Sequence, residues 1–230
     1  MKRKLQTAIV LGMTFLYANS FGQTANSSPE NTKKEKVPSH SHFDILLNVV
    51  NTSLNYGDFN AALTDSKKTI HGVQVGASYQ SVITPNFSLV SEFYFIMKGG
   101  GLKADNPLTL QQSILRLYTL ETPLLARFSF GKVFINAGPS IAYNLFGTRK
   151  IEDESKALSF TKSAGNFKRW DAGIQMGGGY IFETKQKSIV MDIRYTYGVS
   201  NIAYGQEIYN RTVNIGIHIS RLRKAKPTEK

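Results

Sequence analysis

The feature that most constrains this fold is an alternation of apolar and polar residues that recurs between residues 43 and 221. Successive side chains of a β-strand point to opposite sides, so alternation with a period of two predicts strands with two unlike faces. The last segment is the clearest case, and the apolar residues on its one face are Val213, Ile215, Ile217 and Ile219. Nothing reads as a long amphipathic helix, so the sequence predicts an all-β fold.

Eight segments carry this pattern, and their connections alternate between long and short. The segments span about residues 43–51, 69–83, 87–97, 114–130, 132–145, 167–182, 188–199 and 211–221. The long connections are 52–68, 98–113, 146–166 and 200–210, and the short ones are 84–86, the region around Gly131, and 183–187. Such alternation is typical of membrane barrels with long outer loops and short periplasmic turns. We therefore expect an eight-stranded antiparallel up-and-down transmembrane β-barrel with both termini on the periplasmic side.

Two prolines fall inside predicted strands. Pro123 lies in the fourth segment and Pro139 in the fifth. Proline cannot donate a hydrogen bond to the strand ladder, so both residues predict bulges or changes of register.

Alternation alone does not separate a soluble barrel from a membrane barrel, but the apolar face does. Large aromatic residues lie on that face near both ends of the strands, as expected where rings settle at the two headgroup levels of a bilayer. The predicted aromatic girdles comprise Phe87, Phe128, Phe130, Tyr180 and Phe182 by the short turns, and Phe93, Phe95, Tyr143, Trp170, Tyr195 and Tyr197 by the long loops.

The opposite face carries charges of both signs and several glycines. We predict a polar network inside the barrel from Asp44, Glu92, Glu121, Arg127, Asp171, Asp192 and Arg194. Buried ions on this scale are costly in a soluble core, whereas the narrow interior of an eight-stranded barrel can be filled by them. The prediction is a barrel without a wide pore.

The ends of the chain predict export. Lys2, Arg3 and Lys4 precede a short apolar run and small residues, which is the pattern of a signal peptide over residues 1–22. Its removal would lower the formal net charge from +12 to +9. Residues 23–42 are polar and contain two prolines, which indicates a flexible periplasmic linker, and residues 222–230 form a basic tail.

Composition excludes several kinds of chemistry. The chain has no cysteine and four scattered histidines, so we expect neither disulfides nor a metal site, and no cofactor. The glycines 177–179 lack the following Lys-Ser/Thr of a phosphate loop. Nucleic acid is a poor partner for an exported chain, so the expected contacts are outer-membrane lipid and envelope or secretion proteins.

Several segments resemble the strand motifs of the PorT-like outer-membrane β-barrel family. They are the segments LETPLL at 120–125, INAGPS at 135–140, DAGIQMGGGY at 171–180, DIRYTYG at 192–198 and LVSEFYF at 89–95. The resemblance covers about residues 43–221 and implies a small barrel of the Bacteroidota envelope. The namesake of the family assists protein secretion, but no residue here carries that role. The basic tail also departs from the terminal aromatic usual in bacterial barrels.

The pair His218 and Ser220 leaves an enzyme as an alternative interpretation. His218 and Ser220 share a strand face, as in the His-x-Ser pair of lipid A deacylases, and a carboxylate on a neighbouring strand could complete a triad. The pair is expected inside the barrel near the periplasmic end, away from outer-leaflet lipid, which favours a polar filler.

The main hypothesis is a non-enzymatic barrel that acts through its long loops, or as a structural or assembly factor of the envelope. A ligand-binding or surface-binding barrel is the alternative. Its candidate residues are the aromatic and basic loop residues Tyr56, Phe59, Lys67, Lys68, Arg149, Lys150, Lys162, Tyr204 and Tyr209.

Overall fold

The structure is a computed structural model that describes residues 41–108, 110–183 and 187–221. The predicted signal peptide 1–22, most of the linker 23–42 and the tail 222–230 lie outside the described residues.

Within the described residues the chain forms ten strands, two of them short. The long strands are β1 (His42–Asn55), β3 (Ile70–Thr84), β4 (Phe87–Leu102), β5 (Ser113–Phe130), β6 (Val133–Ile151), β8 (Trp170–Glu183), β9 (Lys187–Gly198) and β10 (Tyr209–Arg221). The short strands are β2 (Lys67–Lys68), which extends the sheet beside β4, and β7 (Glu154–Ala157), which pairs with β6. A 3-10 helix, η2 (Gly57–Asn60), follows β1.

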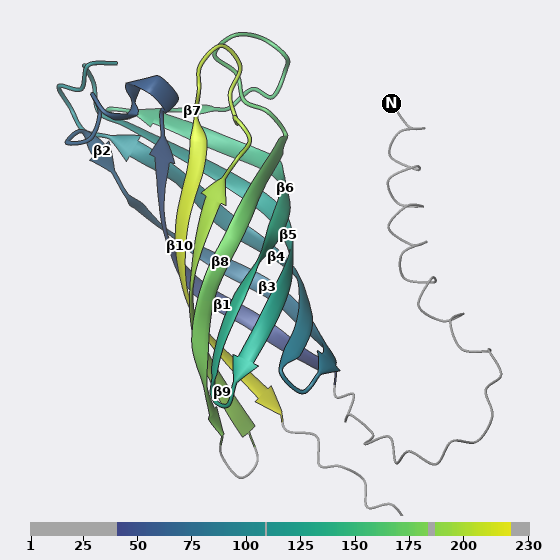
Figure 1. Cartoon of the computed structure of the whole chain (residues 1–230). Helices are drawn as coiled ribbons and strands as arrows, with labels where there is room; N and C mark the ends of the chain where they lie inside the picture. The colour runs from purple at the N-terminus through teal and green to yellow at the C-terminus, as the bar shows by residue number, and fades with distance from the viewer. Residues whose placement is uncertain (1–40, 109, 184–186, 222–230) are drawn as a thin grey trace, which may run out of the picture. The chain divides into compact units, whose positions relative to one another are not determined.

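The eight long strands close into an antiparallel barrel. The first strand β1 pairs with the last strand β10, and each other long strand pairs with its neighbours, including β4 with β5. Long loops gather at one end of the barrel and tight turns at the other (Figure 1). The start of β1 and the end of β10 both lie at the turn end. The prediction of an eight-stranded antiparallel barrel is confirmed.

Several strands run further toward the loops than predicted. Residues 98–102 belong to β4 and residues 146–151 to β6, although the sequence analysis assigned both stretches to long loops. These extensions contain glycine or charged residues, so they lack the apolar alternation by which strands were recognised. They pair with β5 nonetheless, since backbone hydrogen bonds do not depend on side-chain polarity.

The prolines do not shift the register, so that prediction is wrong. Pro123 pairs with Ser140, and Pro139 pairs with Ile174, and neither register shifts at the proline. Pairing between β5 and β6 is interrupted at Leu124 and Leu125, and pairing between β4 and β5 at Thr122 and Pro123, but both resume in the same register. The register of β5 and β6 shifts instead between Tyr118 and Thr119. A proline withholds one donor, and the pairs on either side of it keep the strands aligned.

The turns that the structure describes are tight. Pro85 and Asn86 join β3 to β4, and Gly131 and Lys132 join β5 to β6. Gly131 has a φ of 64°, a left-handed conformation that glycine adopts without cost. The third predicted turn, at residues 184–186, lies outside the described residues.

The strands alternate between a buried inner face and an exposed outer face. On β1 the outward residues are apolar from Phe43 to Val49, and the inward residues include Leu46 and Asn48. A small apolar cluster of Leu46, Val50, Tyr94 and Ile96 lies inside the barrel. None of the helices in the described part of the chain is long and apolar enough to cross a membrane.

Candidate functional site

The interior of the barrel is filled by charged and polar side chains. Six of the residues predicted for the polar network are buried there, namely Glu92, Glu121, Arg127, Asp171, Asp192 and Arg194. The seventh, Asp44, is half-buried near the turn end of β1. They lie on five different strands, so barrel closure brings together residues from distant parts of the sequence.

Arg194 on β9 is the centre of one ion cluster. Its guanidinium donates to Glu92 Oε2 at 2.7 Å and to Asp192 Oδ2 at 2.6 Å. His218 Nε2 lies 3.2 Å from Asn48 Oδ1 and 3.7 Å from Asp192 Oδ1. A buried charge costs several kcal/mol unless it is paired, so one arginine satisfies two carboxylates here.

Glycines make room for this cluster. A Cβ atom at Gly177 would lie 2.6 Å from the Cγ atom of Arg194, and a Cβ atom at Gly216 would lie 2.6 Å from Asn48 Oδ1 and 2.9 Å from His218 Nε2. All three distances are shorter than real Cβ contacts, so a side chain at either glycine would displace the residues of the cluster. These glycines therefore serve the close packing expected of a filled interior.

Arg127 on β5 contacts two neutral side chains. Its Nη1 atom donates to Gln80 Oε1 at 2.7 Å, and its guanidinium lies 4.2 Å from the ring centroid of Phe134. The ring face attracts the cation, so the aromatic contact adds to the hydrogen bond with Gln80.

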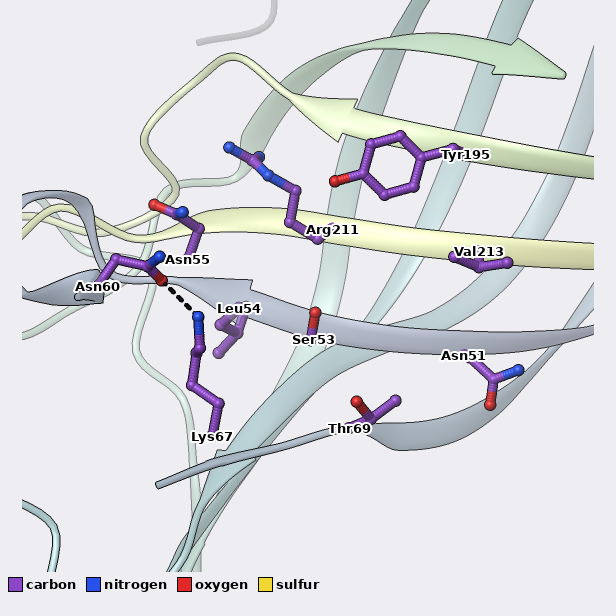
Figure 2. Close-up of a pocket in the computed structure, with 10 residues that line it drawn as sticks. All are labelled: Asn51, Ser53, Leu54, Asn55, Asn60, Lys67, Thr69, Tyr195, Arg211 and Val213. Carbon is purple, nitrogen blue, oxygen red and sulfur yellow. Dashed lines mark hydrogen bonds between the residues drawn. The ribbon is translucent and has the colours of Figure 1, made fainter. Parts of the chain in front are cut away.

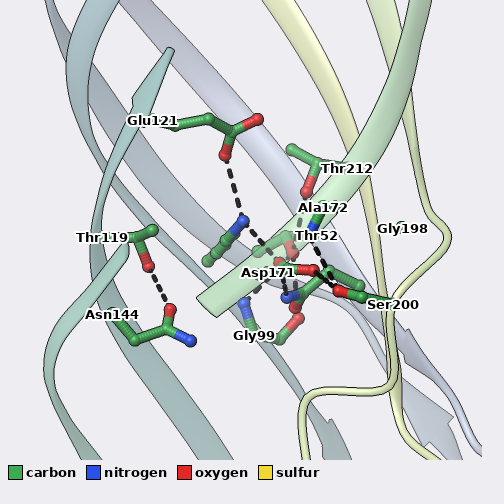
Figure 3. Close-up of polar contacts among 12 residues, drawn as sticks. Thr52, Gly99, Thr119, Glu121, Asn144, Asp171, Ala172, Gly198, Ser200 and Thr212 are labelled. Atoms are coloured by element: carbon green, nitrogen blue, oxygen red, sulfur yellow. Dashed lines mark hydrogen bonds and ion pairs between the residues drawn. The ribbon is translucent and has the colours of Figure 1, made fainter. Parts of the chain in front are cut away.

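Lys98 on β4 is the centre of a second ion cluster, nearer the loops. Its Nζ atom lies 3.0 Å from Glu121 Oε2 and 2.9 Å from Asp171 Oδ2. Asp171 also accepts hydrogen bonds from Asn210 Nδ2 at 2.7 Å and from Ser200 Oγ at 2.8 Å, and Figure 3 shows Asp171 beside Ser200. The cluster thus joins β4, β5, β8 and β10 across the barrel.

Neutral residues extend this cluster. Gln175 Nε2 donates to Glu121 Oε1 at 2.8 Å and to the hydroxyl of Tyr94 at 2.7 Å. Above it, the Thr52 hydroxyl donates to the Gly99 carbonyl at 2.9 Å and accepts from the Gly99 amide at 3.1 Å. These bonds connect strands that are not neighbours in the sheet.

The filling leaves little open space beside Lys98. The cavity between Lys98, Asp171 and Thr196 has a volume of about 10 Å³, which is room for one water molecule at most. The buried charges that the structure describes also nearly balance, with three cations and four anions. They are Lys98, Arg127 and Arg194, and Glu92, Glu121, Asp171 and Asp192.

A hydrophobic cap covers the interior at the loop end. Its buried residues come from strand ends and from the loops that follow β7 and β9. They are Leu54, Leu115, Leu117, Phe167, Ile202, Ala203 and Ile208, with Tyr56, Leu158 and Phe160 packed against them. Tyr56 belongs to this cap, where burial raises its pKa to about 12 against the opposing effect of the nearby Arg149.

The aromatic residues predicted for the girdles all lie on the outer face. Ring pairs form near the turns, with Phe87 against Phe128 at 4.9 Å and Tyr180 against Phe182 at 4.6 Å. Nearer the loops, Trp170 meets the edge of Tyr143 at 5.0 Å.

One detail of that prediction needs correction. Phe93 lies near the middle of β4 rather than by the long loops, because the strand continues to Leu102. Phe95 instead joins a stack that the sequence analysis missed. Its centroid lies 6.2 Å from Tyr118, whose ring lies 4.4 Å from Phe146.

Comparison with known proteins decides the family. The profile of the outer membrane protein beta-barrel domain family matches residues 45–204, which is more than half of the chain. The chain belongs to this family. It is a small outer-membrane β-barrel protein, and its outer apolar face contacts membrane lipid. No curated protein sequence matches the chain.

Solved structures of small outer-membrane proteins resemble this member of the family. Ail, the attachment invasion locus protein of Yersinia pestis, is 13% identical over 79% of this chain and 99% of its own, with a TM-score of 0.44. Neisserial surface protein A is 12% identical over 79% and 98%, with a TM-score of 0.45. Outer membrane protein W of E. coli is 16% identical over 80% and 100%, with a TM-score of 0.38.

Lys98 is a charged lumen residue of this family member that the predicted polar network did not include. The predicted strand ended at residue 97, so Lys98 fell at the start of the long connection 98–113. The alternation along β4 could have revealed it. Lys98 lies an even number of residues after Glu92 on the same strand, so both side chains point inward.

The pair considered for a hydrolase is only partly described. His218 is buried among Asn48 and Asp192, whereas the side chain of Ser220 lies outside the described residues. In the described part of the chain no group of three or more His, Cys, Asp or Glu residues is arranged to hold a metal ion.

Proposed function

We propose that this protein is a non-enzymatic, non-conducting barrel that acts through ordered surface loops, with the short turns and the start of β1 in the periplasm. The observation that carries the proposal is the closed interior. The Lys98 cluster joins four strands beneath a hydrophobic cap. An interior filled in this way leaves no path for solutes, so the loops are the part of the barrel free to meet a partner.

One loop is built to display apolar side chains. In the connection from β4 to β5, the buried Asn106 side chain donates to the carbonyls of Lys103 and Gln111 and accepts from the Leu108 amide. Leu108 and Leu110 are exposed, and Leu110 has a φ of 57°. A leucine in the left-handed region is uncommon and costs free energy, which supports a functional reason for its place.

The preceding loop is attached to this one. The Lys103 amide donates to the Ser66 carbonyl at 2.8 Å, and Lys103 Nζ donates to the Asp65 carbonyl at 2.8 Å. Phe59 on η2 in that loop is 62% exposed. Exposed apolar anchors on ordered loops are typical of protein–protein contact, so we assign the partner to the class of envelope or external proteins.

The charge of the loops gives less support for a binding site made of the basic loop residues considered above. The connections 56–69, 103–112, 152–169 and 199–208 together contain seven acidic and seven basic residues. Arg149 lies 5.3 Å from the Phe167 centroid, and Lys150 pairs with Asp153 at 3.3 Å, so both are engaged within the chain. Among the basic candidates, Lys68 and Lys162 are exposed. The resemblance to the PorT-like family is compatible with an envelope partner.

Two measurements test the closed interior and the orientation. The purified protein should give no stable conductance in planar lipid bilayers, and a steady open channel would overturn the proposal. Because the chain has no cysteine, single cysteines at Lys162 in a loop and Lys132 in a turn can be labelled on intact cells. An impermeant maleimide should label Lys162→Cys and spare Lys132→Cys, whereas the reverse pattern would invert the orientation.

Loop recognition is tested by crosslinking in cells. A photo-crosslinking residue at position 59 should capture a discrete envelope or external protein. The combined Leu108→Ala and Leu110→Ala substitutions should reduce that adduct, while the matched Lys68→Gln and Lys162→Gln variant should keep it. An adduct that persists in the leucine variant, or no adduct at all, would contradict loop recognition.

The hydrolase alternative receives less support from the position of His218. Its imidazole is buried within the barrel, where an acyl chain of the outer leaflet does not reach. Comparing lipid A from cells with no barrel, the native barrel or the Ser220→Ala variant tests this. Deacylation that depends on Ser220 would replace the proposal by an enzymatic one.

A further inference from the structure

A polar groove lies on the outside of the barrel, below the loop that follows β1. It has a volume of about 390 Å³ and opens beside β1, β9 and β10 (Figure 2). This volume lies within the range of small-ligand sites. The residues that line it are Asn51, Ser53, Leu54, Asn55, Asn60, Lys67, Thr69, Tyr195, Arg211 and Val213.

The groove lies where the apolar outer surface ends. On β1 the outward positions change from the exposed Val49 to Asn51 and Ser53. On β10 the outward positions change in the same way, from Val213 to Arg211. Because the apolar band faces lipid, the groove lies at the level of the lipid headgroups.

Two cations border the groove, and its ten lining residues include no acid. The Arg211 guanidinium lies 3.6 Å from the ring centroid of Tyr197, and its Nη1 atom donates to the carbonyls of Gly198 and Asn210 at 2.8 Å. These contacts fix the guanidinium in place before any ligand arrives. A preorganised arginine binds an anion at a lower entropic cost.

Lys67 supplies the second cation from the opposite side. Its Nζ atom donates to Asn60 Oδ1 at 3.0 Å, which uses one of three ammonium donors (Figure 2). The side chains of Asn51, Asn55 and Ser53 also line the groove. The amide oxygens of Asn51 and Asn55 already contact His71 Nδ1 and the Gly57 amide, so their amide nitrogens and the Ser53 hydroxyl are the donors left for a ligand. Cations together with neutral donors, and no carboxylate, are the chemistry that binds phosphate.

We propose that this groove binds the phosphorylated sugar headgroup of an outer-leaflet lipid. Val213 and Tyr195 form its lower edge and continue into the apolar band. A lipid can therefore place its phosphate between Arg211 and Lys67 while its acyl chains lie on the strands below. Free phosphate would satisfy the cations but would gain nothing from that apolar edge.

This lipid site goes beyond the proposed loop function. It rests on that proposal only for the orientation of the barrel, with the loops outside and the short turns in the periplasm. Its test uses the full barrel in nanodiscs of phosphatidylcholine with lipid A added, because both leaflets of a nanodisc are accessible. Failure of the test would therefore bear on the groove and not on the orientation. Native mass spectrometry then counts the lipid A molecules retained by each barrel.

The variants are Arg211→Gln, Lys67→Gln and their combination. The matched control is Arg116→Gln, an outward arginine on β5, which lies on another side of the barrel. Loss of a charged hydrogen-bond partner should weaken lipid A binding about tenfold for each single variant. The control should bind like the native barrel, and heat-modifiable migration on gels confirms that each variant is folded.

Three outcomes would overturn the proposal. Equal retention by the native barrel and the double variant would exclude the groove. If Arg116→Gln lost as much bound lipid A as the groove variants, the binding would be a general attraction between basic residues and anionic lipid. Displacement of lipid A by inorganic phosphate at similar concentration would make free phosphate the ligand, whereas dephosphorylated lipid A is expected not to bind.

Discussion

The guanidinium of Arg194 on β9 donates a 2.7 Å hydrogen bond to the carboxylate of Glu92 on β4, the strand on the opposite wall of the barrel. The same guanidinium holds Asp192 on its own strand. The three side chains are buried, so this contact ties two walls of the barrel together away from solvent.

Replacing Arg194 by Met should therefore destabilise the barrel strongly. It leaves Glu92 and Asp192 buried without their cation, and breaking a buried pair in this way costs about 3–5 kcal/mol. Urea unfolding in lipid vesicles measures the change in the free energy of unfolding. Adding Glu92→Gln and Asp192→Asn to the same chain should recover part of the loss, and a single variant as stable as the native barrel would contradict the pairing.

Removing a large side chain from the hydrophobic cap should also destabilise the barrel. Phe167 is buried among Leu54, Leu117 and Ile202, so Phe167→Ala should cost about 3–5 kcal/mol through lost burial and the cavity left behind. The same unfolding measurement applies. Phe59→Ala is the matched control, because Phe59 is exposed and its removal should change stability by about 0.5 kcal/mol or less. Equal effects of the two substitutions would show that the cap does not pack as described.

The outer face predicts an effect that depends on depth in the bilayer. Ile193 lies outward in β9 and is 57% exposed, so Ile193→Lys places an ammonium group in the hydrocarbon and should cost about 2–4 kcal/mol. Val199, 49% exposed just beyond the end of the same strand, is the control, and Val199→Lys should cost about 0–1 kcal/mol. Folding into vesicles with equal yield and stability for both variants would place β9 outside the membrane.

Tyr56 predicts a change of stability at alkaline pH. Burial raises its pKa from 10.0 to about 12, so the folded state keeps this phenol protonated where the unfolded state has lost the proton. The resulting stabilisation is complete below pH 10 and is lost as the pH rises through about 12. The phenolate absorbance of the native barrel minus that of Tyr56→Phe should titrate near 12. Arg149→Gln should move that midpoint higher, since the Arg149 charge lowers the pKa, and a midpoint near 10 would exclude burial of Tyr56.

Much of the barrel follows from the sequence because its pattern is local. The side chains of a strand alternate, so Val213 to Ile217 and Ile189 to Tyr197 reveal their lipid-facing side without knowledge of their neighbours. The same parity placed Glu92, Asp192 and Arg194 together on the inner face. Strand ends were less predictable, because β4 and β6 continue through glycines and charges that carry no apolar alternation.

The sequence by itself thus determined the eight barrel strands, their order and which side chains of the recognised segments point inward, since each depends on residues close together in the chain. Only the tertiary structure decided which inward residues meet. Closing the barrel brings Lys98 to Asp171 and Arg194 to Glu92 across the interior, and it sets Lys67 beside the same groove as Arg211. Those partners depend on strand register and closure, and local alternation specifies neither.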